Sequence, residues 1–127
     1  MVRNMFSLGV FMLAITSALS SSCCPSIVLQ SSGDLASSNQ AHILGNYNLV
    51  SDDAEGRPIY QLDSSLPRFI FYRSGINNWF VNDQTGINQG YALNTGTEEC
   101  ISDSTGVWEY WDGNAWVQDL YTSAICV

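Results

Sequence analysis

The residues best suited to contacting a ligand lie close together between Gly106 and Val117, where the chain reads GVWEYWDGNAWV. This stretch contains three tryptophans, a tyrosine and an Asp-Gly pair. Sugar-binding sites combine exposed aromatic rings with Asp, Asn and Glu side chains that bind hydroxyl groups. A small β-domain with an aromatic core has the same composition, so both interpretations stay open. The residues predicted to bind a ligand are Trp111, Trp116, Asp112, Asn114 and Trp79.

Two hairpin registers fit this stretch. A two-residue turn at Gly113-Asn114 sets Trp111 opposite Trp116, whereas the commoner Asp112-Gly113 turn sets Trp111 opposite Asn114. In both registers, alternation along the strand places Trp111 on the face opposite to Tyr110. We therefore expect one aromatic pair to face the core and at least one tryptophan to lie near the surface beside a carboxylate.

Catalytic residues are not predicted. His42 is the only histidine, and no G-x-S-x-G or reactive-cysteine pattern surrounds any candidate nucleophile. A small carboxylate-dependent hydrolase using Glu109 is a remote alternative, because spacing sets no second carboxylate apart. The chain has no C-x-x-C pair and no calcium-loop pattern, so neither a metal nor another cofactor is expected.

The four cysteines, Cys23, Cys24, Cys100 and Cys126, predict disulfides formed outside the cytosol. We favour a Cys100–Cys126 bridge, whose loop of about 26 residues is worth about 3 to 4 kcal/mol. It leaves Cys23 and Cys24 to each other or to another chain, so a disulfide-linked dimer is one possible outcome. The competing solution joins both N-terminal cysteines to Cys100 and Cys126.

The N-terminus predicts secretion. Arg3 precedes an apolar run over Met5–Ile15 and a segment of small residues, which is the pattern of a cleaved signal peptide over residues 1–20. Cleavage after Ser20 or Ser22 leaves a single extracellular domain over residues 21–127, with no later run long enough to span a membrane. That domain carries three arginines and no lysine against twelve Asp and Glu, which excludes nucleic-acid binding.

Short strands position these residues. Alternating or β-branched runs recur about every ten positions, separated by turn residues, and helical periodicity is absent. The pattern predicts an all-β fold, a small antiparallel sandwich or barrel of about seven to nine short strands, stabilised by disulfides. The strands are expected at Pro25–Gln30, Gly45–Val50, Pro58–Leu62, Arg68–Arg73, Trp79–Val81 and Gly90–Leu93, followed by the hairpin over Trp108–Val117.

Several motifs occur in a fixed order along the chain: Gly45-Asn46-Tyr47, Gly56-Arg57-Pro58-Ile59-Tyr60, Phe69-Ile70-Phe71-Tyr72, Trp79, Trp108-Glu109-Tyr110-Trp111, Trp116 and Cys126. In this order they resemble a small extracellular β-module that recurs in secreted and multidomain proteins of invertebrates and protists. The resemblance covers Pro25–Val127 and implies fold and location, but no particular activity.

The functional prediction is a secreted, non-catalytic binding or structural module. Its aromatic and acidic or amide surface residues would contact an extracellular protein or matrix partner, since Tyr, Trp and Arg are the usual anchors of interfaces. The alternative is a lectin-like carbohydrate-binding domain that uses the tryptophan-rich hairpin.

Overall fold

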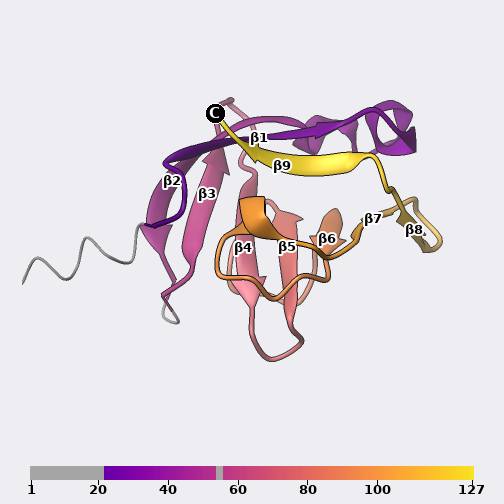
Figure 1. Cartoon of the computed structure of the whole chain (residues 1–127). Coiled ribbons are helices and arrows are strands. Elements are labelled where there is room, and N and C mark those ends of the chain that lie inside the picture. The colour runs from indigo at the N-terminus through magenta and orange to yellow at the C-terminus, as the bar shows by residue number, and fades with distance from the viewer. Residues whose placement is uncertain (1–21, 54–55) are drawn as a thin grey trace, which may run out of the picture.

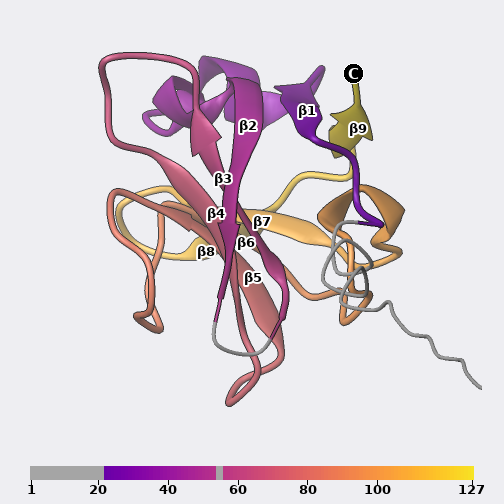
Figure 2. The same cartoon turned by 90° about the vertical axis from the view of Figure 1, so that its left-hand side faces the viewer.

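A computed structural model of the chain describes residues 22–53 and 56–127. Within them, nine strands form one antiparallel sheet that is curled into a half-barrel, and three short 3₁₀ helices connect strands (Figures 1 and 2). The predicted all-β, disulfide-stabilised fold is therefore confirmed. The predicted signal segment, residues 1–20, lies outside the described residues.

The elements follow the chain in a simple order. The strands are β1 Ser26–Ser31, β2 Gly45–Asp52, β3 Pro58–Leu62, β4 Phe69–Arg73, β5 Asn78–Asn82, β6 Ala92–Asn94, β7 Trp108–Trp111, β8 Trp116–Gln118 and β9 Thr122–Cys126. The 3₁₀ helices are η3 Asp34–Ser37, η4 Ala41–Ile43 and η5 Ile101–Asp103.

The connection between the last two strands requires the sheet to curl. The strand order is β8-β7-β6-β5-β4-β3-β2-β1-β9, so β8 and β9 form opposite edges. In a flat sheet, eight interstrand spacings would separate these edges by about 38 Å. Only residues 119–121 connect them, and four Cα steps span at most about 14 Å. The two edges must therefore approach each other.

Most predicted strands lie where the alternation placed them. β3 runs over Pro58–Leu62, as predicted, and the bounds of the other predicted strands shift by one or two residues. The sequence predicted neither β9 nor the short 3₁₀ helix η3.

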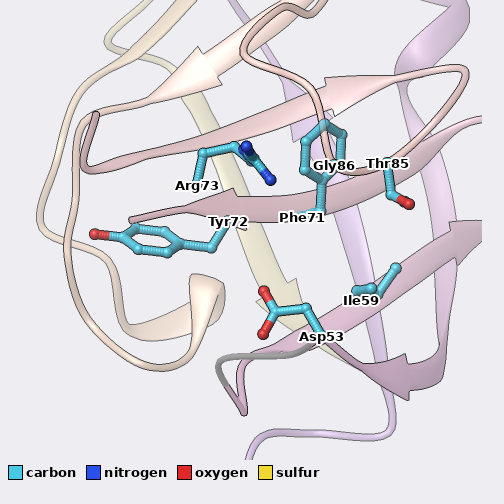
Figure 3. Close-up of a pocket in the computed structure, with 7 residues that line it drawn as sticks. All are labelled: Asp53, Ile59, Phe71, Tyr72, Arg73, Thr85 and Gly86. Carbon is cyan, nitrogen blue, oxygen red and sulfur yellow. The ribbon is translucent and has the colours of Figure 1, made fainter. Parts of the chain in front are cut away.

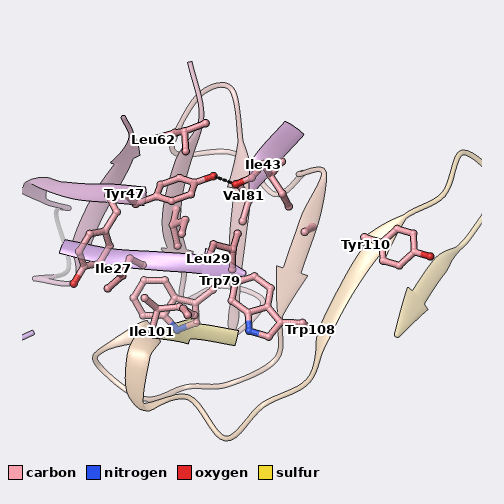
Figure 4. Packing of buried hydrophobic residues seen from close by; sticks show 14 of the residues in the cluster. Ile27, Leu29, Ile43, Tyr47, Leu62, Trp79, Val81, Ile101, Trp108 and Tyr110 are labelled. Atoms are coloured by element: carbon pink, nitrogen blue, oxygen red, sulfur yellow. Dashed lines mark hydrogen bonds between the residues drawn. The ribbon is translucent and has the colours of Figure 1, made fainter. Parts of the chain in front are cut away.

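The inner face of the curled sheet holds the main core (Figure 4). Tyr47 and Trp79 are fully buried there, and the Tyr47 hydroxyl donates to the Ile43 carbonyl at 2.6 Å. Tyr60 is also fully buried and donates to the Cys24 carbonyl at 2.7 Å, and burial raises its pKa to about 12. The tyrosines thus bury their rings while each hydroxyl keeps a hydrogen-bond partner.

A smaller apolar cluster covers part of the outer face. It consists of the buried side chains of Phe71, Phe80 and Leu93, with Ile59, Phe69 and Ile87 packed against them. Ile87 belongs to the loop between β5 and β6, so this loop covers the outer face of the central strands.

Two intrachain disulfides join the segment just before β1 to the start of η5 and to the end of β9. Cys23 pairs with Cys100 and Cys24 with Cys126, with Cα–Cα distances of 5.4 and 5.8 Å. The favoured Cys100–Cys126 pairing is wrong, and the competing solution is correct. The physical reason is that β9 pairs with β1, which puts Ile27 opposite Cys126 and brings Cys126 to the start of β1. No free cysteine is left to form a disulfide-linked dimer.

Candidate functional site

The turn of the last hairpin fixes its register. Trp111 lies opposite Trp116 in the β7–β8 pair. The N–H of Asp112 donates to the Ala115 carbonyl at 3.1 Å, which leaves Gly113-Asn114 as the central pair of the turn. The register with Trp111 opposite Trp116 is thus confirmed, and the Asp112-Gly113 alternative is wrong. Glycine suits the first central position because its φ is 110°.

The Asp112 carboxylate supports this turn from within. Its Oδ1 atom accepts hydrogen bonds from the N–H groups of Asn114 at 2.7 Å and Ala115 at 2.8 Å. The hydrogen bonds from Ala115 and Asn114 lower the pKa of Asp112, so this exposed carboxylate stays ionised at neutral pH. Oδ1 of Asp112 thus accepts hydrogen bonds within the turn, while the negative charge of the carboxylate remains at the surface next to Trp111.

The two faces of the hairpin differ sharply in exposure. Trp108 and Tyr110 point into the core and are each 6% exposed. Trp111 and Trp116 point outward and are 37% and 38% exposed. Their rings form an edge-to-face pair with centroids 5.5 Å apart and planes inclined by 64°. As expected, one aromatic pair faces the core, and a second pair, which we call the tryptophan pair, lies at the surface.

Trp79 does not join the tryptophan pair. It lies on β5 between β4 and β6, is fully buried, and packs edge-to-face against Tyr72 with ring centroids 5.3 Å apart. Of the five residues predicted to bind a ligand, the structure therefore brings Trp111, Asp112, Asn114 and Trp116 together on one exposed hairpin and places Trp79 in the core.

Two exposed residues that the sequence did not single out, Leu120 and Tyr121, lie in the connection between β8 and β9. Leu120 is 73% exposed and Tyr121 is 70% exposed. Together with Ser32, Gly33, Asp34, Gln118 and Asp119 they line a shallow hollow of about 450 Å³. The only signal in the sequence was a Leu-Tyr pair in the short segment that follows the hairpin.

Three carboxylates influence the buried Tyr110 of the hairpin. Burial raises the pKa of Tyr110, and the negative charges of Asp34, Asp119 and Asp112 raise it further.

Asp119 is the buried member of this group and anchors the connection between β8 and β9. It is 4% exposed and accepts hydrogen bonds from Ser31 Oγ at 2.9 Å, Leu35 N–H at 2.9 Å and Tyr121 N–H at 2.8 Å. Burial raises the pKa of Asp119, but the hydrogen bonds from Leu35, Tyr121 and Ser31 outweigh this, so the pKa lies below its ordinary value. The ionised carboxylate thus ties β1 and η3 to the β8–β9 turn.

A chain of hydrogen bonds connects His42 to the hairpin. Arg68 Nε donates to His42 Nδ1 at 2.9 Å, His42 Nε2 lies 2.9 Å from Gln40 Oε1, and Gln40 Nε2 donates to the Trp111 carbonyl at 2.8 Å. Arginine can only donate, so Nδ1 is the acceptor and Nε2 carries the proton. Each group then has a partner, and His42 has a structural role in positioning the hairpin.

Tyr91 packs against this chain. Its ring lies edge-on to the His42 ring at 4.7 Å between centroids, and the Arg68 guanidinium lies 4.9 Å from the ring centroid. The carbonyl of Tyr91 also accepts the Trp111 N–H at 3.0 Å. The backbone of Trp111 is therefore fixed from two directions while its ring stays exposed.

A second hollow, of about 280 Å³, lies over β3 and β4 (Figure 3). Its lining includes the side chains of Ile59 and Phe71 from the outer cluster, with Arg73 and Thr85 at its rim. Arg73 Nε donates to Asn88 Oδ1 at 2.9 Å, which ties β4 to the loop above it. Glu109, the carboxylate considered for hydrolysis, lines neither hollow.

Within residues 22–53 and 56–127, no group of three or more His, Cys, Asp or Glu side chains is arranged to hold a metal ion. In the same part of the chain, no helix has the length and apolar character needed to cross a membrane.

Comparisons with known proteins add no relative. No protein-family model matches the chain, and no curated protein or solved structure matches it at a significant level. The resemblance to an extracellular β-module therefore rests on the sequence motifs alone.

Proposed function

We propose that this chain is a secreted, non-catalytic binding or structural module that contacts an extracellular protein or matrix partner through its last hairpin. The contact surface consists of the tryptophan pair, the adjoining Asp112 and Asn114, and Tyr121 beyond β8. Two intrachain disulfides support an extracellular location, because such bonds persist in oxidising compartments. The signal-like N-terminus of the sequence supports it as well.

One observation carries the proposal: the chain buries Trp79 and Trp108 but exposes more than a third of both Trp111 and Trp116. Leaving apolar surface in water forgoes about 25 cal/mol per Å² of stabilisation, so a chain with a modest core gains nothing by exposing two indoles. Tryptophan is also among the residues that dominate binding energy at interfaces. An exposed, rigidly held tryptophan pair is therefore best explained by a partner.

The proposal is tested with the oxidised chain from residue 21 to residue 127. Its binding to a panel of purified extracellular-matrix proteins is measured by calorimetry, for the wild type and for the Trp111→Ala/Trp116→Ala variant. Val50→Ala serves as the control, because Val50 is 50% exposed on β2, away from the hairpin. We expect at least one partner that the tryptophan variant loses and the control retains. Equal binding by all three proteins would show that the contact surface lies elsewhere.

Carbohydrate binding is the second candidate function. It is favoured by the polar neighbours of the tryptophan pair, since the exposed Asp112 and Asn114 offer a carboxylate and an amide for sugar hydroxyl groups. Titration with a broad glycan panel should then quench tryptophan fluorescence in the wild type. The absence of any saturable response across the panel would remove this candidate.

A further inference from the structure

We infer that the tryptophan pair binds a basic, extended peptide segment, with a lysine or arginine side chain of the partner held against the two indole rings. This inference rests on the proposed function and names the chemical class of its partner.

The geometry of the pair suits a cation. The planes of Trp111 and Trp116 are inclined by 64° with centroids 5.5 Å apart, so the two rings meet edge to face and do not form one flat platform. A flat sugar face stacks best on a broad ring plane, whereas a compact ammonium or a guanidinium group needs only the exposed part of an indole face. Cations are attracted to indole faces within about 6 Å of the ring centroid, and tryptophan is the strongest of the aromatic side chains in this respect.

The charge around the pair is complementary to a basic partner. Glu109 lies two residues before Trp111 on the same face of β7, opposite Gln118 of β8. Asp112 adjoins the pair from the turn, and Asp34 lies at the hollow beyond β8. Asp119 lines the same hollow as Asp34, so two carboxylates border it.

The three arginines among the described residues are held elsewhere. Arg57 lies over the Tyr72 ring at 3.7 Å, and its Nη1 atom donates to the carbonyls of Thr97 and Glu98. Arg73 donates to Asn88 Oδ1. Arg68 is connected to the hairpin through His42, but its guanidinium lies over Tyr91 and not at the tryptophan pair. Because the described residues contain no lysine and their three arginines are held elsewhere, none of these side chains supplies a cation at the tryptophan pair, and the cation that matches this surface is one from a partner.

The strand that carries Trp116, β8, can also accept a peptide backbone. Among the described residues, β8 pairs with β7 alone and forms an edge of the sheet. Edge strands present unpaired N–H and C=O groups to which an extended segment can add. The hollow lined by Asp34, Gln118 and Tyr121 continues from the end of β8 and offers a place for a second basic side chain.

The experiment uses the oxidised chain from residue 21 and three eight-residue peptides that alternate threonine with arginine, glutamine or glutamate. Binding is measured by calorimetry, because its signal does not depend on tryptophan fluorescence. Each titration is done at low and at high salt. We expect the arginine peptide to bind at least about tenfold more tightly than the glutamine peptide, and salt to weaken it strongly by screening. The glutamate peptide should not bind.

Variants then locate the contact. Trp111→Ala and Trp116→Ala should each weaken arginine-peptide binding by about threefold or more, and Trp116→Phe by less than Trp116→Ala. Glu109→Gln should weaken binding, whereas Asp63→Asn, which removes the same charge from an exposed turn after β3, should not. Unchanged arginine-peptide binding in both tryptophan variants would overturn the inference.

Other outcomes separate this inference from the proposed function. If glycans, neutral peptides or phosphatidylcholine vesicles bind at Trp111 and Trp116 and the arginine peptide does not, the basic partner is wrong and the hairpin remains a binding site. If no probe, including the matrix panel, distinguishes the tryptophan variants from wild type, the proposed function itself is wrong.

Discussion

Arg68 donates a hydrogen bond from Nε to Nδ1 of His42 at 2.9 Å, and this bond requires His42 to be neutral. A protonated imidazole would present a second donor and a second positive charge to the guanidinium. Burial lowers the pKa of His42 below its ordinary value of 6.5, and the charge of Arg68 lowers it further. The position of the hairpin is thus linked to the protonation state of one side chain.

The first prediction concerns pH. A base whose pKa is lower in the folded state stabilises the fold fully above its unfolded pKa, and this contribution is lost as the pH falls through the folded value. Between about pH 7 and pH 5, acidification should therefore reduce the free energy of unfolding of the wild type. His42→Gln should be less stable by about 1 kcal/mol at pH 7 and should lack this slope, since no other imidazole is present. Guanidinium unfolding at the two pH values measures both effects, and an equal slope in the variant contradicts the assignment.

The second prediction concerns Gly33, which lies against the buried carboxylate of Asp119. A Cβ atom at this position would overlap Asp119 Oδ1, so an alanine must displace the carboxylate from its three donors. Gly33→Ala should lower the free energy of unfolding by about 2 to 4 kcal/mol. Gly75→Ala is the matched control, because a Cβ there meets no atom within 4 Å, and its effect should stay within about 0.5 kcal/mol. Similar losses in both variants would count against this role of Asp119.

The third prediction concerns the contribution of the ionised Asp119 to the free energy of unfolding at acidic pH. Its pKa is lowered in the folded chain, so its stabilisation is complete above the unfolded value of about 3.9 and is lost as the pH falls through the lower folded value. Asp119→Asn should cost about 1 to 3 kcal/mol at pH 7, because a side-chain amide would face backbone donors in a buried site. The deficit relative to wild type should shrink below about pH 3. A deficit that stays constant from pH 7 to pH 2 would contradict this account.

The fourth prediction tests the disulfide pairing. Cys24→Ser/Cys126→Ser removes one complete bridge, with a sequence separation of 102 residues, and leaves Cys23–Cys100 intact. We expect a folded chain without free thiols. It should be less stable by about 3 to 4 kcal/mol on the chain-entropy scale, because the intact Cys23–Cys100 bridge shortens the loop that Cys24–Cys126 closes to about 27 residues.

The control variant replaces one cysteine of each bridge. Cys23→Ser/Cys126→Ser removes one partner from each bridge, so the remaining two cysteines should titrate as free thiols or mispair. A non-reduced peptide linking Cys100 to Cys126 in the wild type would disprove the pairing.

How far the sequence predicts this fold depends on the range of each interaction. Alternation is local, and it located β3 residue for residue because Pro58, Tyr60 and Leu62 face the core while Ile59 and Gln61 do not. The pairing of β9 with β1 joins residues about a hundred positions apart, and no local pattern specifies it. The disulfides depend on that pairing, so loop length alone favoured the wrong bridge.

The candidate site was predictable in part for the same reason. The alternation in Trp108–Trp111 correctly separated an inward from an outward face. The sequence could not separate Trp79 from Trp116, because the difference lies in the face of the curled sheet that each side chain occupies: Trp79 belongs to the main core, whereas Trp116 points outward. The link from Arg68 through His42 and Gln40 to Trp111 joins three separate segments and left no signal in the composition.

The last prediction concerns the turn that presents the tryptophan pair. Asp112 accepts two backbone N–H groups within the turn, so Asp112→Ala removes both hydrogen bonds and should destabilise the hairpin by about 1 kcal/mol. Asp112→Asn keeps a side-chain oxygen that can accept the same bonds, and it should retain most of the stability while losing the charge.

The coupled indoles of Trp111 and Trp116 should give an exciton signal in far-ultraviolet circular dichroism, because their rings lie 5.5 Å apart at a fixed inclination. That signal should weaken in Asp112→Ala and persist in Asp112→Asn. If basic peptides bind as inferred, Asp112→Asn should also weaken their binding at unchanged hairpin structure, which separates the charge of this carboxylate from its role in the turn. An exciton signal of full strength in Asp112→Ala would show that strand pairing alone holds the rings in place.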